Sequence, residues 1–231
     1  MSAQRVKLLV ASAVAAAIVV AIAIAASQVG SGPSAKTLAK DSRETSALLD
    51  GIPQQGVTLG RPDAPLTLTE FADLQCPFCR QYTLDVFPKL VRRYVRTGRV
   101  RMVFRGLTII GSQSVIAARA AGAAGLQNRL WQFAEVFYRN QGDENTGYVR
   151  PKFLRRIAGA AKLDVARLER ETTSPAVQQQ LTSAAAEASR LGVKGTPAFF
   201  TSRAGEQPQR LGYSSLTAGE FQHKIDARLA G

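Results

Sequence analysis

Apolar and polar residues recur along the chain in patterns that predict an α/β fold. Residues 66–71 alternate apolar and polar up to Glu70, which is typical of a strand. A helical pattern begins at Pro77, with apolar residues mostly three or four positions apart, and ends at Gly98. Residues 100–104 are rich in β-forming residues and predict a second strand.

A helical block separates these strands from the C-terminal elements. The apolar spacing is helical from about residue 112 to residue 192. Two short strands follow, at 195–201 and 209–212, and an amphipathic helix over 215–229 ends the chain. The order strand, helix, strand, helical block, strand, strand, helix predicts an α/β fold with helices inserted in its middle.

The first 26 residues predict a membrane anchor. Residues 8–26 carry no charge, and as a helix they would span roughly 28 Å, about the thickness of a bilayer's hydrocarbon core. Arg5 and Lys7 precede this stretch and the next charge is Lys36, so we expect a cytoplasmic N-terminus and an extracytoplasmic domain. Small residues between 21 and 25 resemble a signal-peptide cleavage site, so secretion after cleavage is the first alternative. A buried soluble helix is the second.

Residues 27–55 predict a linker between the anchor and the domain. They are rich in Ser, Gly, Lys, Asp and Pro. A short helix over about 37–49 fits within them, because Leu38, Leu48 and Leu49 could dock on a neighbouring element.

The composition excludes several classes of protein. Of the 231 residues, 45% are hydrophobic and 20% charged, so the chain can bury a core and is not disordered throughout. Its two cysteines, Cys76 and Cys79, exclude a disulfide-rich scaffold and a four-cysteine zinc site. Its one histidine, His223, excludes centres that need two. We therefore expect no metal and no cofactor.

The chain is basic, with 30 Lys and Arg against 17 Asp and Glu. No acidic residue occurs between Asp85 and Glu135, where there are several arginines. We interpret this stretch as a solvated face, with attraction to anionic lipid headgroups as the alternative. No binding of nucleic acid is expected, because an exported domain seldom meets it.

The two cysteines carry the candidate chemistry. Cys76 follows a predicted strand and begins a helix, whose free N–H groups and dipole favour a thiolate. Cysteines in such positions have pKa values of roughly 3.5–7.5 rather than about 8.5. Cys79 is one helical turn further on, so it can form a disulfide with Cys76, and we expect it to be the more buried, resolving thiol.

Two other interpretations of the pair are weaker. A purely structural disulfide would close a ring of about four residues and would stabilise the fold by only roughly 2 kcal/mol. Half of a zinc site would need two more ligands, and His223 is the only further nitrogen or sulfur candidate.

The segment Glu70-Phe-Ala-Asp-Leu-Gln-Cys76-Pro-Phe-Cys79, together with Gly195-Thr-Pro197 and the helices between, resembles the DsbA-like thiol–disulfide oxidoreductases. The resemblance covers about residues 56–231 and implies a thioredoxin fold with a helical insertion. It also implies that Pro197 is cis and shields the sulfurs, and that Thr196 pairs its backbone with a substrate peptide. Pro77 and Phe78 complete the substrate-binding residues that it implies.

Two further residues refine this picture. Glu70 shares a strand face with Leu66 and Leu68, and family members commonly carry a buried acid at its position. A buried carboxyl has a raised pKa and could relay protons for Cys79, whereas a solvent-exposed Glu70 is the alternative. The best-known members have histidine where this chain has Phe78, which cannot stabilise the Cys76 thiolate. We therefore expect an oxidase of moderate potential.

The resemblance implies an extracytoplasmic oxidase that introduces disulfides into exported, unfolded polypeptides. A membrane partner, of the DsbB type or the vitamin K epoxide reductase type, would reoxidise the Cys76–Cys79 pair. The same apparatus kept reduced would serve as a reductase or isomerase, and a non-catalytic thioredoxin-fold scaffold is the third candidate. We expect a monomer, because no dimerisation module is evident.

Overall fold

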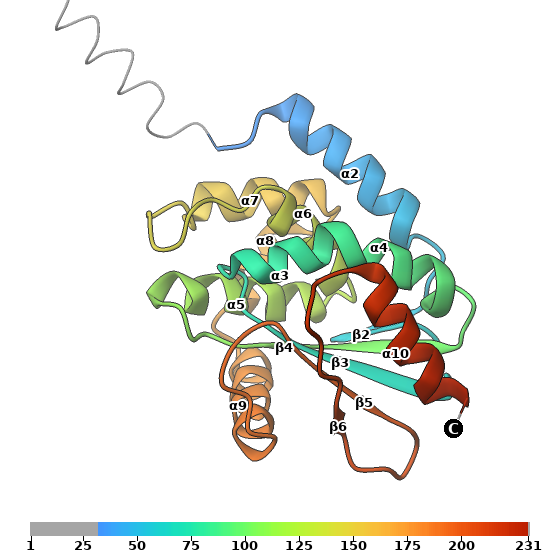
Figure 1. Cartoon of the computed structure of the whole chain (residues 1–231). Coiled ribbons are helices and arrows are strands. Elements are labelled where there is room, and N and C mark those ends of the chain that lie inside the picture. Colours follow the sequence, from blue (N-terminus) through green and yellow to red (C-terminus); the bar gives the residue numbers. More distant parts are fainter. Residues whose placement is uncertain (1–31, 231) are drawn as a thin grey trace, which may run out of the picture. The chain divides into compact units, whose positions relative to one another are not determined.

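A six-stranded sheet forms the centre of the part of the chain that the computed structural model describes, residues 32–230. The strand order is β1-β2-β4-β3-β5-β6, and only β3 and β4 pair in parallel (Figure 1). The bounds are β1 Gln54–Gln55, β2 Thr58–Leu59, β3 Leu66–Ala72, β4 Val100–Gly106, β5 Ala198–Ser202 and β6 Gln209–Arg210. The four predicted strands are confirmed, whereas β1 and β2 are too short for a residue pattern to predict.

Strand β3 lies between β4 and β5 and is buried on both faces. Leu66 and Leu68 belong to the larger core, while Phe71 belongs to a smaller cluster on the opposite face. Because side chains alternate along a strand, Glu70 points into the larger core with the two leucines. The predicted shared face is therefore confirmed.

One helical run connects β3 to β4. It consists of α3 Pro77–Gln81, the π-helical stretch η1 Tyr82–Val86, α4 Phe87–Leu90 and the π-helical stretch η2 Val91–Val95. The run continues past Pro88, which has no amide hydrogen to donate. The residue before it, Phe87, donates its N–H to the Tyr82 carbonyl five residues back, as in a π-helix. Gly98 ends it with a φ of +74°.

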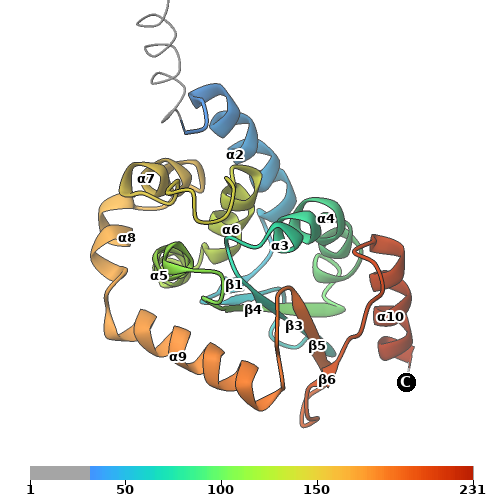
Figure 2. The same ribbon diagram turned by 60° about the vertical axis from the view of Figure 1, so that its left-hand side comes forward.

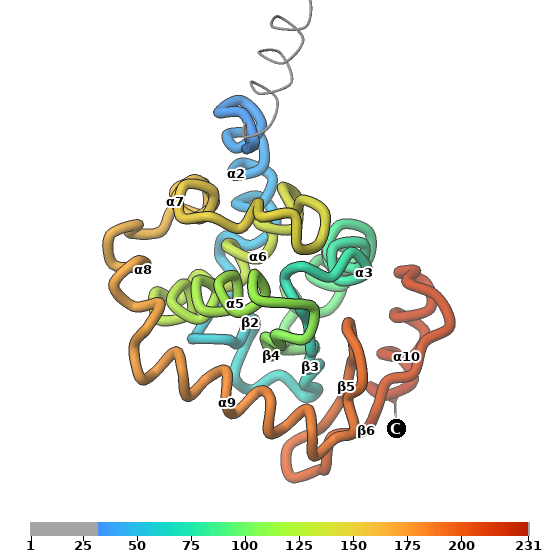
Figure 3. The backbone as a smooth tube through the Cα atoms, turned by 90° about the vertical axis from the view of Figure 1, so that its left-hand side faces the viewer, coloured from blue at the N-terminus to red at the C-terminus, as the bar shows by residue number. Residues whose placement is uncertain are grey.

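The predicted helical insertion is confirmed between β4 and β5. Its helices are α5 Ser112–Gly125, α6 Leu130–Arg139, α7 Pro151–Ala160, α8 Val165–Glu171 and α9 Pro175–Arg190. Figure 3 shows the chain passing from α7 through α8 to α9. Helix α9 covers the sheet face opposite to α3 and α4, while α10, Ala218–Ala230, packs beside α4 (Figure 2).

Helix α2, Ala35–Leu49, corrects the predicted domain boundary. It packs against α6 and α7 and buries Leu38, Leu48 and Leu49, so the predicted short helix is confirmed. Its leucines make residues from 35 onward part of the folded unit, and the linker predicted over 27–55 is too long. The predicted anchor at 8–26 lies outside the described residues. Within residues 32–230, no helix combines the length and the apolar character needed to cross a membrane.

Candidate active site

Cys76 lies where the chain passes from strand β3 into helix α3. Its backbone is extended, with φ −69° and ψ 122°, and its carbonyl accepts a helical hydrogen bond from the Arg80 N–H at 3.1 Å. Pro77 occupies the first turn, where its missing N–H costs no hydrogen bond. Cys79 is fully buried one turn further on. The strand-to-helix position predicted for the motif is confirmed.

A buried aspartate shapes this turn. Asp73 is fully buried, and its Oδ1 accepts a hydrogen bond from the Gln75 N–H at 2.9 Å. Its Oδ2 accepts from the N–H groups of Ile109 and Ile110, at 2.9 and 3.1 Å, in the loop between β4 and α5. The carboxylate thus joins the end of β3 to the loop that follows β4. We did not single out Asp73 from the sequence, although its bond to the residue two positions on is a common aspartate turn.

Two glutamines join the active-site turn to the helical insertion. Gln75 is fully buried; its Nε2 donates to Ser114 Oγ at 3.0 Å, and its Oε1 accepts from the Asn145 N–H at 2.9 Å. Gln141 Nε2 donates to the carbonyls of Leu74 and Cys76, at 2.8 and 3.1 Å. These contacts join residues far apart in the sequence, so no local pattern could predict them.

Cys76 has the environment of a reactive thiol. It is 4% exposed, and its Sγ donates to the Thr196 carbonyl at 3.2 Å. A hydrogen bond from the Cys79 thiol is the main reason that the pKa of Cys76 is lowered to about 6. The Thr196 side chain and the N–H groups of Cys79 and Phe78 lower it further, and burial opposes them. The second thiol therefore contributes more than the helix N-terminus that the sequence pointed to.

Cys79 has the opposite environment. Burial raises the pKa of its thiol well above the ordinary value, and the nearby charges of Cys76 and Glu70 raise it further. Both cysteines are free thiols in this structure. Two thiols three residues apart thus differ in the direction of their pKa shifts.

The Thr196–Pro197 peptide bond is cis, as the resemblance implied. It directly precedes β5, and Tyr213 Oη donates to the Pro197 carbonyl at 2.7 Å. Thr196 is half-buried and its carbonyl accepts from Cys76, while Phe78, two residues after Cys76, is 61% exposed. The structure therefore brings the residues expected to bind substrate to one place.

Glu70 is 2% exposed, so the prediction of a buried acid is confirmed and the alternative of a solvent-exposed Glu70 is wrong. Burial raises the pKa of its carboxyl to about 8, and the charge of Glu135 adds to the effect. Glu135, on α6, is itself 1% exposed. No local sequence pattern indicates this second acid, because α6 reaches Glu70 only through the tertiary fold.

The comparisons with known proteins agree with this geometry. The family model described as Thioredoxin matches residues 53–208. The chain is 29% identical over 147 residues to "Probable disulfide bond formation protein D" of Bacillus cereus, which covers 62% of this chain and 68% of that one. It is 32% identical over 102 residues to disulfide bond formation protein D of Bacillus subtilis, covering 43% of this chain and 46% of the relative.

Solved structures share the fold. The fold matches that of oxidised BdbD from Bacillus subtilis with a TM-score of 0.66 at 23% identity, over 78% of this chain and 98% of that one. It matches a thioredoxin-like oxidoreductase from Silicibacter pomeroyi with a TM-score of 0.61 at 26% identity, over 86% and 99% of the two chains. The chain therefore belongs to the thioredoxin family and is a DsbA-like thiol–disulfide oxidoreductase.

Proposed function

We propose that Cys76 and Cys79 are the redox pair of this enzyme and that it oxidises thiols of exported proteins to disulfides. The observation that carries the proposal is the contrast between the two thiols. The pKa of Cys76 is lowered to about 6 and that of Cys79 is raised well above its ordinary value. A thiol of low pKa is a good leaving group, which favours release of an oxidised substrate.

The exchange proceeds in two displacements. A substrate thiolate attacks Cys76 Sγ in the Cys76–Cys79 disulfide, the bond between the two cysteines breaks, and Cys79 leaves as a thiolate. Glu70 supplies the proton that this buried thiolate takes up. A second substrate thiolate then attacks the substrate sulfur of the mixed disulfide, and Cys76 leaves as a thiolate. The substrate gains a disulfide and the two cysteines are reduced.

The surroundings of Cys76 suit an extended polypeptide. In a disulfide, Cys76 has no hydrogen to donate to the Thr196 carbonyl, so this carbonyl becomes free to accept from a substrate N–H. Phe78 and Ile109 are exposed large hydrophobic residues, at 61% and 56%. Ile109 belongs to the loop that binds Asp73. Together with Pro77 and Pro197 they would contact apolar side chains of an unfolded chain, and no folded epitope is needed.

The place of action is proposed from the sequence and the relatives. The uncharged segment 8–26 would hold the domain on the outer side of the membrane as a single-pass anchor. The name of the relatives, disulfide bond formation protein D, supports a role in forming disulfides. A membrane oxidase of the DsbB or vitamin K epoxide reductase type would return the pair to the disulfide, and tethering raises the local concentration of the two partners. We propose that the enzyme acts as a monomer.

Refolding of reduced, denatured ribonuclease by the oxidised enzyme tests the proposal. The wild type is expected to restore ribonuclease activity, and Cys76→Ser is not. Equal activity of the two would favour a non-catalytic scaffold. Trapping of thiols in living cells tests the direction: an oxidase is recovered mostly as the disulfide, whereas recovery mostly as dithiol would mean a reductase or isomerase.

A further inference from the structure

Two buried carboxyl groups face one small cavity behind the cysteines. Glu70 on β3 and Glu135 on α6 are 2% and 1% exposed, and both line it. Glu70 Oε1 and Glu135 Oε2 have no hydrogen-bond partner among the described residues. The other walls are largely apolar, with contributions from Phe87, Phe104 and Trp131.

The cavity has the size of a single water molecule. Its volume is about 10 Å³, close to the least volume that holds one water. A buried polar atom without a partner is costly, whereas a water between Glu70 and Glu135 could bond to both. The cavity can therefore connect the two carboxyl groups.

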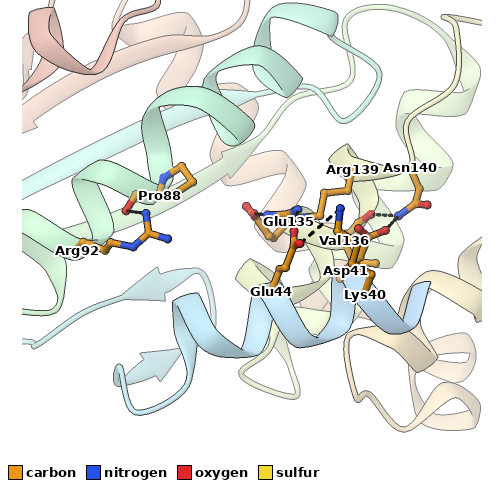
Figure 4. Close-up of polar contacts among 9 residues, drawn as sticks. All are labelled: Lys40, Asp41, Glu44, Pro88, Arg92, Glu135, Val136, Arg139 and Asn140. Atoms are coloured by element: carbon orange, nitrogen blue, oxygen red, sulfur yellow. Dashed lines mark hydrogen bonds and ion pairs between the residues drawn. The ribbon is translucent and has the colours of Figure 1, made fainter. Parts of the chain in front are cut away.

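The other oxygen of Glu135 is held from the opposite side. Arg139 Nε and Nη2 both donate to Glu135 Oε1, at 3.2 and 2.9 Å. Arg139 also pairs with Glu44 of α2, and Figure 4 shows the arginine between the two acids. The side chain of Glu135 is fully buried, that of Arg139 is 21% exposed and that of Glu44 is 42% exposed. The three side chains thus lead from the cavity to the surface beside α2.

The charges of the two acids are linked. The pKa of Glu70 is raised to about 8, mainly by burial and further by the charge of Glu135. Burial also raises the pKa of Glu135, to about 7, while Arg139 limits the rise. Because ionising one acid opposes ionising the other, the pair holds a proton around neutral pH.

We propose that Glu135 is a positioning residue for thiol–disulfide exchange, which shares a proton with Glu70 across the cavity and so sets how readily Glu70 exchanges a proton with Cys79. The inference rests on the proposed role of Cys76, Cys79 and Glu70. It adds a second buried acid, on the helical insertion, that tunes the protonation of Glu70 while its partner Arg139 lies on the side away from Glu70.

Glutathione disulfide can oxidise the reduced enzyme in two displacements. A Cys76 thiolate first forms a mixed disulfide with glutathione and releases one glutathione. Cys79 then transfers its proton to Glu70, and its thiolate attacks Cys76 Sγ and displaces the second glutathione as a thiolate. Glu70 and Glu135 then hold that proton between them until it exchanges with solvent, where the glutathione thiolate takes up a proton.

The titratable groups that face the pair come from three directions. Cys79 on α3, Tyr82 on η1 and Tyr138 on α6 interact with Glu70. Arg139 on α6, together with Asp41 and Glu44 on α2, interacts with Glu135. The residues of β4 and α4 at the cavity, Phe104 and Phe87, do not titrate. A change at Glu135 therefore reaches Cys79 through Glu70.

The test is the titration of Glu70 in the reduced full-length protein in mild detergent, followed by NMR of isotope-labelled glutamate carboxyl carbons. Glu70→Gln assigns the signal. In Glu135→Gln the titration midpoint of Glu70 is expected to fall by at least about one pH unit, because a like charge is removed. Glu187→Gln is the matched control: Glu187 also pairs with an arginine, Arg105, but on α9 across the sheet. It should leave the midpoint unchanged.

A second measurement follows the chemistry. The pH profile for release of the second glutathione from glutathione disulfide should move to lower pH in Glu135→Gln and not in Glu187→Gln. If Glu135→Gln does not fold, Glu135→Leu removes the same charge while Arg139 keeps Glu44 as its partner, and a lowered Glu70 midpoint is expected there too. An unchanged or raised midpoint, with exchange still abolished by Cys76→Ser, would overturn this inference alone. Exchange that survives in Cys76→Ser would instead overturn the proposed function.

Discussion

The outer and inner ends of the first turn of α3 place the same side chain in opposite surroundings. At the outer end, Cys76 meets hydrogen-bond donors and its pKa is lowered to about 6. At the inner end, Cys79 meets apolar surface and negative charge, and its pKa is raised well above the ordinary value. The residue type is the same and the separation is three positions, so the environment alone accounts for the opposite pKa shifts, which support the proposed attacking role of Cys76 and resolving role of Cys79.

The two ends are also built differently. The outer end is fixed by polar contacts: Asp73, Gln75 and Gln141 together bind backbone groups of the turn and of the loops around it. The inner end is a nearly closed core that encloses Glu70 and Glu135. Hydrogen bonds thus fix the position of Cys76 at the outer end. Burial sets the protonation of Glu70 and Glu135 at the inner end.

The largest effect is expected from replacing the two cysteines one at a time. In Cys79→Ser, a mixed disulfide with substrate forms on Cys76 and cannot be resolved within the enzyme, so turnover should fall by about 10³-fold or more. Mass spectrometry after brief incubation with a peptide disulfide, which the Cys76 thiolate attacks to release one peptide thiolate, should show the adduct. Cys76→Ser is the matched variant and should form little adduct, because Cys79 is buried and protonated. Equal adduct in the two would contradict the contrast between them.

The outer end was largely predictable from the sequence, and the inner end was not. Cys76, the strand before it and the helix after it follow from patterns within about ten residues. Glu70 could be placed because strand alternation is local. Glu135 could not, since it lies 65 positions further on and meets Glu70 only when α6 packs over the sheet.

The errors have the same physical origin. Helix α2 has a polar composition, so its sequence resembles a linker, and only its contacts with α6 and α7 make it part of the domain. The two π-helical stretches depend on backbone hydrogen bonds between residues five apart, from the Phe87 N–H to the Tyr82 carbonyl and from the Arg96 N–H to the Val91 carbonyl. No side-chain pattern specifies these bonds. Tertiary packing decided both.

The second prediction concerns Glu70→Gln and the pH dependence of stability. The pKa of Glu70 is about 8 in the folded protein against 4.5 for an ordinary glutamate, so folding favours its protonated form. That stability is fully present below about pH 4.5, falls as the pH rises from there, and is lost above about pH 8, so the window runs from about pH 4.5 to about pH 8. The wild type should therefore lose stability relative to Glu70→Gln by up to about 1.4 kcal/mol for each pH unit in that window.

Urea denaturation of the reduced proteins over this pH range measures the difference. Glu187→Gln, which removes a carboxylate on α9, serves as the control and should not show the same slope. Parallel stability profiles for the wild type and Glu70→Gln would mean that Glu70 titrates normally, and the inner end would lose its special character.

The third prediction concerns Asp73, whose carboxylate holds the turn at the outer end by hydrogen bonds. Asp73→Ala leaves the buried N–H groups of Gln75, Ile109 and Ile110 without their acceptor. The free energy of unfolding should fall by about 3 kcal/mol, at roughly 1 kcal/mol for each lost bond. Asp63→Ala is the control, because Asp63 forms an exposed pair with Arg61 and should matter little. Urea denaturation checks both, and equal midpoints would show that Asp73 does not stabilise the turn.

The smallest effect is expected from Phe78→His, which changes only the outer end. Phe78 is 61% exposed beside Cys76, so an imidazole there can approach the thiolate without displacing core residues. A histidine can donate a hydrogen bond or a positive charge, which lowers the pKa of Cys76 further and stabilises the reduced form. The reduction potential should rise by on the order of 30 mV, a tenfold change in the equilibrium with glutathione. Phe78→Leu keeps an apolar side chain and should leave the potential unchanged. A glutathione titration in which Phe78→His leaves the reduction potential unchanged or lowers it would contradict this expectation. The residue between the cysteines would then not set the potential, and the contacts of Cys76 with Cys79 and Thr196 would already determine the stability of its thiolate.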